Sequence, residues 1–393
     1  MPFINDVKKF FNETTTFKYG PRHRALYEFT NYYINRFTYH KKRWEKEYSK
    51  AGDVTEVPYK IIEEGITNLG KNNFCSEKIY EKILLNRDTH KSYHYGYKKD
   101  DTSFHFYFFS KKPPSNSFLK KLVITTNVIC DDCLDKPKKI SILFCDTGFK
   151  KMLPDRKEMI GPNEVNSGST TFIGDERMIH IWRREERIKV YIHELLHAMG
   201  VETETIRDVF KVEPFMKHFN VDIPLLLLGE AYVETYATYL NLFVYFVIDR
   251  ASKPERSEII DGFNLEVEYS TYQVSKLLYH FGYRFVREIY NKKGVKRDKF
   301  VDKWKEDSNV FSYYLIKWGL LSNICKMFEM CDIKNRIPCG VTDLNLDLFI
   351  KTLLLSWNKR KFTSVINKHI ADMSDKNSRY KYIGKTLRMT VYG

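Results

Sequence analysis

The stretch that decides the fold of this chain runs Val190-Tyr191-Ile192-His193-Glu194-Leu195-Leu196-His197-Ala198-Met199-Gly200. Apolar residues recur through it with helical spacing, so we expect one helix over residues 185–199, with Gly200 favouring a stop there. His193 and His197 are four residues apart, which places both imidazoles on one helix face within reach of one metal ion. Glu194 points toward the same space, where its carboxylate can act on a metal-bound water. The pattern predicts a zinc site; the alternative is an ordinary buried helix that carries these residues by chance.

The chain is large, basic and rich in aromatic residues. It has 393 residues, and 27 Tyr and 28 Phe argue for a folded protein and against disorder. Its 65 Lys and Arg against 50 Asp and Glu give a net charge of +15, which favours an anionic partner such as nucleic acid, an acidic protein segment or a membrane surface. The alternative is a solvated basic surface with no dedicated partner. No stretch has the spacing of a zinc finger or an RNA-recognition consensus.

The N-terminal residues and the cysteines indicate an intracellular protein. The first residues, 1–6, lack the basic and then apolar regions of a secretion signal. Seven cysteines, an odd number, suit a reducing compartment with free thiols. Cys130 and Cys133 form a CxxC pair without a second pair, so we expect free cysteines rather than another metal site. No run reaches the roughly 18 apolar residues of a transmembrane segment. We therefore expect a cytoplasmic protein that is not secreted.

The apolar periodicity changes twice along the chain. Residues rich in β-branched and aromatic side chains predict strands over 103–109, 122–129, 140–144 and 178–182. Residues 90–97 are expected to form a loop. Helical spacing predicts helices over 25–50, 76–86, 214–218, 226–248, 265–290, 310–327 and 344–357, whereas the basic end, 359–393, is less regular.

This order predicts an α+β fold with three parts. Residues 1–98 form an N-terminal helical region. Residues 99–200 form a small mixed β-sheet subdomain that packs on the HExxH helix, the helix that carries His193-Glu194-Leu195-Leu196-His197, and ends with it. Residues 201–393 form a mostly helical C-terminal subdomain with a basic end. A sheet followed by helices, with the metal helix at the junction, resembles the layout of zincin metallopeptidases.

The third metal ligand must come from elsewhere, because catalytic zinc usually has three protein ligands and one open position. In the segment Gly229-Glu230-Ala231-Tyr232-Val233-Glu234, the two glutamates share a face of an otherwise apolar helix. We expect Glu230 as the ligand and Glu234 as the acceptor for a ligand histidine's other N–H. A helix with a solvent-facing polar stripe is the alternative. Lower-ranked ligand candidates are Glu202, Glu204 and Asp208.

These two segments together resemble gluzincin-type zinc metallopeptidases such as thermolysin and the aminopeptidases. The resemblance implies one Zn²⁺ per chain, bound by His193, His197 and Glu230, with Glu234 supporting a ligand histidine. It also implies a protein or peptide substrate and Glu194 as general base. The segment 201–224 is longer than in thermolysin-like enzymes. Thr203 stands where a metzincin has its third histidine, which counts against that branch.

An oxyanion stabiliser is also needed, and in gluzincins it is typically a Tyr or His. We favour Tyr313 or Tyr314 over the segment 279–283. The strand before the metal helix pairs with extended substrate in zincins, which residues 168–172 or 178–182 would do here.

More weakly, the chain from about residue 100 onward resembles uncharacterised HExxH proteins of large DNA viruses. The motifs are Ser167-Gly168-Ser169-Thr170-Thr171, Arg184-Glu185-Glu186 and Val310-Phe311-Ser312-Tyr313-Tyr314. This resemblance implies a host cytoplasm or a virion as the location. Alternative functions are a virion or scaffold protein that zinc stabilises without turnover, and a basic nucleic-acid-binding protein.

Overall fold

Six strands build one mixed sheet at the centre of the N-terminal half of the chain. They are β1 (Thr55–Val57), β2 (Lys91–Lys99), β3 (Thr102–Ser110), β4 (Lys139–Thr147), β5 (Gly168–Ile173) and β6 (Glu176–Arg183). Their order across the sheet is β1-β2-β3-β4-β6-β5. The central strands β3, β4 and β6 run parallel, whereas β1, β2 and β5 pair antiparallel with their neighbours. β5 is therefore an edge strand. The structure is a computed structural model that describes residues 2–11, 18–19, 23–47, 52–133, 136–201, 209–223, 226–294, 302–330, 346–374 and 381–393.

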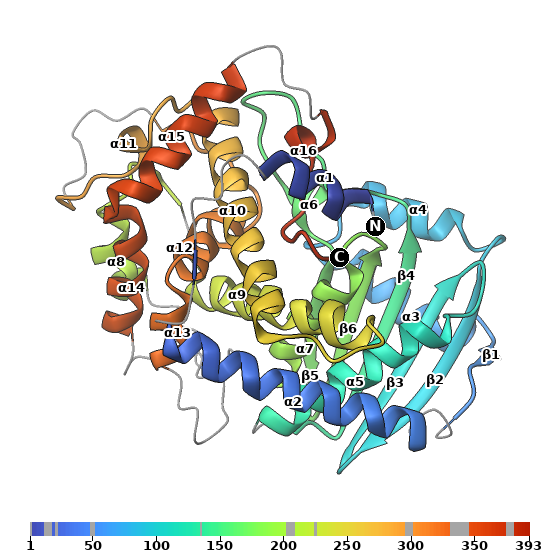
Figure 1. Ribbon diagram of the computed structural model, residues 1–393. Coiled ribbons are helices and arrows are strands. Elements are labelled where there is room, and N and C mark those ends of the chain that lie inside the picture. The colour runs from blue at the N-terminus through green and yellow to red at the C-terminus, as the bar shows by residue number, and fades with distance from the viewer. Residues whose placement is uncertain are drawn as a thin grey trace.

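Helices cover both faces of the sheet (Figure 1). The helices of the N-terminal half are α1 (Pro2–Phe11), α2 (Arg24–Lys46), α3 (Lys60–Gly70), α4 (Glu77–Leu85), α5 (Asn116–Asp132), α6 (Pro162–Val165) and α7 (Arg187–Ala198). On one face, Phe109, Leu143 and Trp182 pack in a small core with α3 and α4. On the other face, Phe106 and Ile142 belong to the main core, together with residues of α5 and α7.

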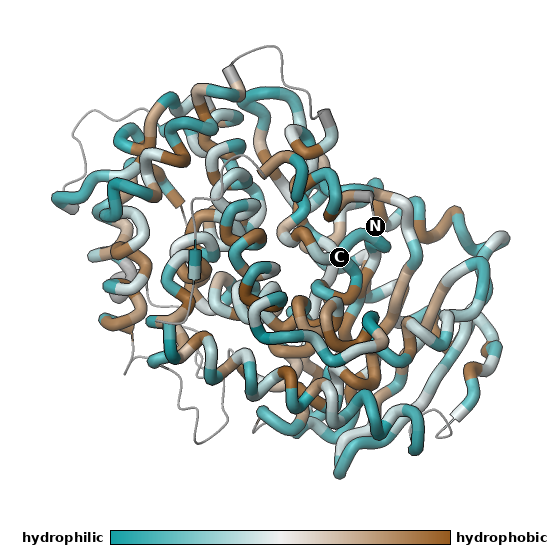
Figure 2. The backbone as a smooth tube through the Cα atoms, viewed as in Figure 1, coloured by the Kyte–Doolittle hydropathy of each residue, from teal (hydrophilic) through white to brown (hydrophobic). Residues whose placement is uncertain are grey.

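The second half of the chain is helical. Its elements are α8 (Val209–Met216), α9 (Leu228–Phe243), the π-helix η2 (Val244–Ile248), α10 (Arg256–His280), α11 (Val286–Ile289), the π-helix η3 (Phe311–Ile316), α12 (Lys317–Leu321), α13 (Ile324–Met330), α14 (Leu346–Asn358), α15 (Arg360–Ser374) and α16 (Lys381–Lys385). α9 packs against α7, η3 and α12, so it joins the two halves. Figure 2 shows hydrophobic residues where the helices meet the sheet and hydrophilic residues in the outer turns.

The α+β class and most of the expected elements are confirmed. The predicted strands over 103–109, 140–144 and 178–182 lie within β3, β4 and β6. The long helix expected over 25–50 is α2, and the two helices expected over 226–248 and 344–357 lie at α9 with η2 and at α14. The helix expected over 265–290 starts earlier and ends earlier, as α10.

The strand predicted over 122–129 is wrong, because these residues lie within α5. Ser115 caps this helix by accepting a hydrogen bond from the Phe118 N–H at 3.2 Å. The whole range 122–129 is buried, so its apolar, β-branched composition reflects a helix enclosed on all sides rather than a strand. Thr126 fits the helix by donating its hydroxyl to the Leu122 carbonyl.

Two further expectations are wrong. Residues 90–97, expected as a loop, form most of β2, in which Tyr93, Tyr95 and Tyr97 are buried. β2 pairs antiparallel with β3, and a tight turn at Asp100 connects the two strands. Asp100 has a φ of 53°, which lies in the left-handed region. The basic end is more regular than expected, because α15 fills residues 360–374.

The sheet and the helices share one main hydrophobic core. That core takes residues from Ile4 in α1 to Tyr392 near the last residue. β1 and all of β2 except Lys99 lie within the range 1–98, so the sheet begins before residue 99. Among the described helices, none is both long enough and apolar enough to cross a membrane.

Candidate metal centre

α7 presents the two histidines of the HExxH motif on one face. The helix begins at Arg187, and Gly200, with a φ of 74°, follows its C-cap in the left-handed conformation that ends helices. His193 is buried, and His193 Nε2 lies 3.1 Å from His197 Nε2. The two nitrogens therefore point at a common position, as the four-residue spacing predicts.

Glu230 brings a third donor atom to the same position. It lies in the first turn of α9, which packs against α7. Its Oε2 lies 3.3 Å from His193 Nε2 and 3.5 Å from His197 Nε2. His193, His197 and Glu230 each offer one ligand atom, and these atoms all lie within 4.8 Å of one another. Among the described residues, this is the group of His, Cys, Asp or Glu side chains that could hold a metal ion.

The donor set fits a zinc ion. Zinc bonds of 2.0–2.2 Å in tetrahedral geometry hold neighbouring ligand atoms about 3.3 Å apart. The three distances of 3.1, 3.3 and 3.5 Å bracket that value. Glu230 Oε2 is buried, and no aligned hydrogen-bond donor reaches it in the described part of the chain. A cation would satisfy this oxygen.

The charges at the cluster suit a metal ion. Burial raises the pKa of the Glu230 carboxyl, but the two imidazoles outweigh it, so this pKa lies below its usual range. For His193, burial lowers the pKa, and the carboxylates of Glu230 and Glu234 more than offset it. An ionised carboxylate facing two imidazoles is the donor chemistry that zinc prefers.

Glu234 orients His193, one helical turn after Glu230 on α9. Its Oε2 lies 3.0 Å from His193 Nδ1. Lys189 and Lys317 contact its other oxygen, Lys317 at 3.3 Å. Burial opposes ionisation of Glu234, but the two ammonium groups dominate and hold its pKa well below the usual range. An ionised carboxylate 3.0 Å from Nδ1 favours a proton on that nitrogen, which would leave Nε2 available to a metal.

Glu194 lies between α7 and the edge strand β5. Its Oε2 accepts a hydrogen bond from the Thr170 hydroxyl at 2.8 Å. A Cβ on Gly168 would lie 2.8 Å from Glu194 Oε1, so only glycine allows this close approach. Burial raises the pKa of Glu194, although both histidines and Thr170 reduce the shift. A raised pKa suits a group that takes up a proton near neutral pH.

Of the two candidate tyrosines, Tyr313 lies beside the cluster and Tyr314 points away from it. The Tyr313 ring, on η3, lies 6.3 Å from the His193 ring, centroid to centroid. A small cavity of about 30 Å³ borders His193, Glu194 and Tyr313, which is room for one or two water molecules. The Tyr314 hydroxyl instead donates to the Leu387 carbonyl at 2.5 Å, so the structure places Tyr314 outside the cluster. Adjacent residues of a helix face different ways, which is why only one of the pair borders the site.

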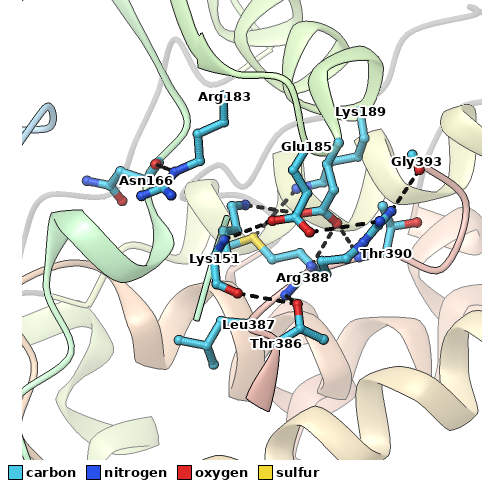
Figure 3. Close-up of polar contacts among 12 residues, drawn as sticks. Lys151, Asn166, Arg183, Glu185, Lys189, Thr386, Leu387, Arg388, Thr390 and Gly393 are labelled. Atoms are coloured by element: carbon cyan, nitrogen blue, oxygen red, sulfur yellow. Dashed lines mark hydrogen bonds and ion pairs between the residues drawn. The ribbon is translucent and has the colours of Figure 1, made fainter. Parts of the chain in front are cut away.

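The C-terminal segment packs against the two lysines that contact Glu234. Residues 386–392 are buried, and Figure 3 shows this segment beside Lys151, Glu185 and Lys189. The Lys317 amine donates to the Met389 carbonyl, and the Lys189 amine lies 3.6 Å from Met389 Sδ. Glu186 Oε1 accepts the backbone N–H groups of Met389 at 2.8 Å and of Thr390 at 2.7 Å. No motif in residues 386–392 indicates these contacts from the sequence alone.

The lower-ranked ligand candidates stay predictions. Glu202, Glu204 and Asp208 lie outside the described residues. Cys130 and Cys133 are buried at the end of α5, and no disulfide joins them in the described part of the chain. Comparison of the chain with protein-family models, with curated proteins and with solved structures gave no match.

Proposed function

We propose that this chain is a zinc-dependent metallopeptidase of gluzincin type. The observation that carries the proposal is the triangle of His193 Nε2, His197 Nε2 and Glu230 Oε2, with Glu194 on the adjacent helical position. His193, His197 and Glu230 would hold one zinc ion. Bound there, zinc would polarise a peptide carbonyl and lower the pKa of a water toward neutrality.

The protein's own groups would then move one proton. Glu194 takes a proton from the attacking water at its carboxylate and later gives it to the leaving amine. The Thr170 hydroxyl holds Glu194 in place by donating to Oε2. Glu234 fixes the tautomer of His193 from the far side of the ring. Tyr313 is the nearest candidate to stabilise the oxyanion, since its ring lies beside His193.

The edge strand β5 is suited to hold the substrate. β5 pairs with β6 on one side, and among the described strands none follows it in the sheet order. An extended peptide could add to this free edge through backbone hydrogen bonds. Thr170 lies on the same strand and contacts Glu194, so a peptide there would pass the proposed base.

The test is the substitution Glu194→Gln. It removes the base without removing a ligand, so zinc content should stay near one per chain while cleavage of a mixed peptide library is lost. Glu64→Gln, an exposed change on α3, is the control and should keep both. Zinc-loaded wild type that cleaves no peptide, or Glu194→Gln protein that still cleaves, would contradict the proposal.

A further inference from the structure

The short helix α11 and the helix α15 lie side by side at the surface of the helical half (Figure 1). Two hydrogen bonds fix their relative position. The Val286 N–H donates to Asn367 Oδ1 at 2.8 Å, and the Tyr290 hydroxyl donates to Asn358 Oδ1 at 3.0 Å. The segments around the two helices therefore form one continuous surface.

Basic side chains dominate this surface. We call the exposed side chains of residues 284–294 and 358–372 the basic face. Its basic residues are Arg284, Arg287, Lys292, Lys293, Lys359, Arg360, Lys361 and Lys368. The acidic residues of the two segments are Glu288 and Asp372. Positive charge therefore exceeds negative charge on the basic face.

The carboxylates nearby leave most of these cations to solvent. Glu288 pairs with Lys303, outside the basic face, at 2.9 Å. The Lys359 amine donates to Asn323 Oδ1 at 2.8 Å, so it has a structural partner. The other exposed cations that form no ion pair with any described residue are Arg284, Lys292, Lys293, Arg360, Lys361 and Lys368. Their charge is available to an anionic partner.

The surface of α3 and α4 shows that the basic surplus is not uniform over the molecule. Its basic residues are Lys60, Lys71, Lys78 and Lys82. Its acidic residues are Glu63, Glu64, Glu77 and Glu81. Mixed signs of this kind are ordinary for a solvated surface, whereas a field of one sign attracts ligands of the opposite sign. The basic face is of the second kind.

α15 presents its polar side to solvent. Phe362, Ile366 and Ile370 recur at helical spacing and are buried in the main core, beside α10. Lys361 and Lys368 are exposed on the other side of the helix. A helix that binds a lipid surface inserts its apolar side, and in α15 that side is already buried. An anionic macromolecule in solution is therefore the better match to the basic face than a membrane.

One aromatic ring is exposed among the cations. Phe285 is 43% exposed, although Phe side chains are usually buried. The Arg287 guanidinium lies 4.9 Å from the centre of its ring. An exposed ring next to arginine can stack on a nucleobase, and such stacking tolerates any base. An acidic peptide segment would match the cations but offers no such flat partner for Phe285.

We propose that the basic face binds single-stranded nucleic acid, with phosphates along Arg284, Lys361 and Lys368 and a base stacked on Phe285. α15 has 15 residues and is therefore about 22 Å long. Over that length the cations can contact several phosphates of one strand. The basic face shares no residue with the metal cluster, and binding there does not depend on the proposed peptidase activity.

Fluorescence anisotropy of a labelled oligothymidylate of about 12 nucleotides, titrated with the full chain, is the measurement. We expect saturable binding that weakens as the salt concentration rises. Lys361→Gln with Lys368→Gln should weaken binding about tenfold and make its salt dependence shallower, because phosphate contacts are lost. Phe285→Ala should weaken binding about tenfold without changing the salt dependence, because it removes stacking but no charge.

The matched control is another exposed pair, Lys78→Gln with Lys82→Gln on α4, which should leave the affinity unchanged. Polyglutamate and phosphatidylserine vesicles are the other anions to be tested, and both should bind more weakly than the oligonucleotide. Four results would overturn the proposal: no saturable binding, equal weakening by the two lysine pairs, full affinity in Phe285→Ala protein, or equally tight binding of polyglutamate or vesicles. All the changed side chains are exposed, so the variants should fold like the wild type.

Discussion

Glu234 connects the candidate metal ligands to the interior of the protein. One of its oxygens contacts His193 Nδ1, and the other contacts Lys189 and Lys317. All four side chains are buried. Removing one member of such a group typically costs about 3–5 kcal/mol, because an uncompensated charge remains buried. The lysines therefore hold Glu234 ionised, and Glu234 in turn holds the His193 ring.

The first prediction concerns this orientation. Glu234→Gln keeps the volume but removes the charge, so His193 loses a strong acceptor for its Nδ1 proton. We expect zinc affinity to fall roughly 10- to 100-fold, as is usual for changes behind a metal ligand. Competition with a chromophoric chelator measures it. Asp132→Asn, a change of another buried carboxyl at the end of α5, is the control and should bind zinc like the wild type. Unaltered affinity in Glu234→Gln would contradict the orienting role.

The sequence predicts the pairs of cluster residues that lie on one helix, and it does not predict contacts between residues of different elements. His193 with His197, and Glu230 with Glu234, follow from four-residue spacing, which fixes geometry within a helix. The partners of Glu234 and Glu194 come from other elements, so spacing could not identify Lys317 or Thr170. Lys189 was available as a signal, because it lies four residues before His193 on an apolar face.

Among the elements, α5 and β2 show where local pattern fails. Val, Ile and Thr occur both in buried strands, such as β4, and in buried helices, and in α5 every residue from 122 to 129 is buried. β2 was mistaken for a loop because its polar residues, such as His94, occupy the half-buried face between core tyrosines. Burial by distant elements, which decided both cases, is not encoded in the local pattern.

The contact between β5 and α7 gives the second prediction. Gly168→Ala places a Cβ 2.8 Å from Glu194 Oε1 and from Val190 Cγ1. We expect a loss of about 1–3 kcal/mol in the free energy of unfolding, as for other overpacked positions. Urea denaturation measures it. At Gly148 an added Cβ meets nothing within 4 Å, so Gly148→Ala should stay within about 0.5 kcal/mol of the wild type. Equal stability of both variants would refute the close approach of strand and helix.

The start of η3 gives the third prediction, through Glu306. Its carboxylate accepts the N–H groups of Phe311 at 2.7 Å and of the Trp304 indole at 2.9 Å. Burial dominates and raises the pKa of Glu306 from 4.5 to about 7. An acid whose pKa is raised by folding stabilises the fold below its unfolded pKa, and this contribution is lost as pH rises through the folded pKa.

Glu306→Gln has no such proton. The stability of the wild type relative to this variant should therefore fall between about pH 5 and pH 8. Denaturation of both proteins at several pH values measures the difference. A constant difference would show that Glu306 titrates near its usual value, and a difference that rises with pH would show that folding lowers the pKa of Glu306; either result contradicts the prediction.

For the molecule as a whole, the metal cluster joins elements that are distant in sequence. His193 and His197 belong to α7, beside the sheet, and Glu230 belongs to α9, which packs against the helices of the second half. A metal ion bound to all three would therefore stabilise only the folded chain. Ligand linkage gives about 4 kcal/mol when the free metal is 1,000 times its Kd.

Removal of zinc is the fourth prediction. Protein treated with a chelator should have a lower Tm than zinc-loaded protein, measured by calorimetry at one protein concentration. Zinc should restore the Tm, whereas Mg²⁺ should not, because Mg²⁺ prefers oxygen ligands. His193→Ala protein should show no difference between the two states. An identical Tm with and without zinc in the wild type would argue against a complete three-ligand site.

The buried C-terminal segment has a consequence for how the protein is made. Residues 386–392 leave the ribosome after α7, α9 and η3, yet the Met389 carbonyl receives the Lys317 amine and Glu186 receives the Met389 and Thr390 N–H groups. A nascent chain that stops short of this segment leaves these buried groups without their partners. The packing around α7 is therefore complete only after residues 386–392 have been made, so a shorter nascent chain would not yet carry the finished candidate metal site.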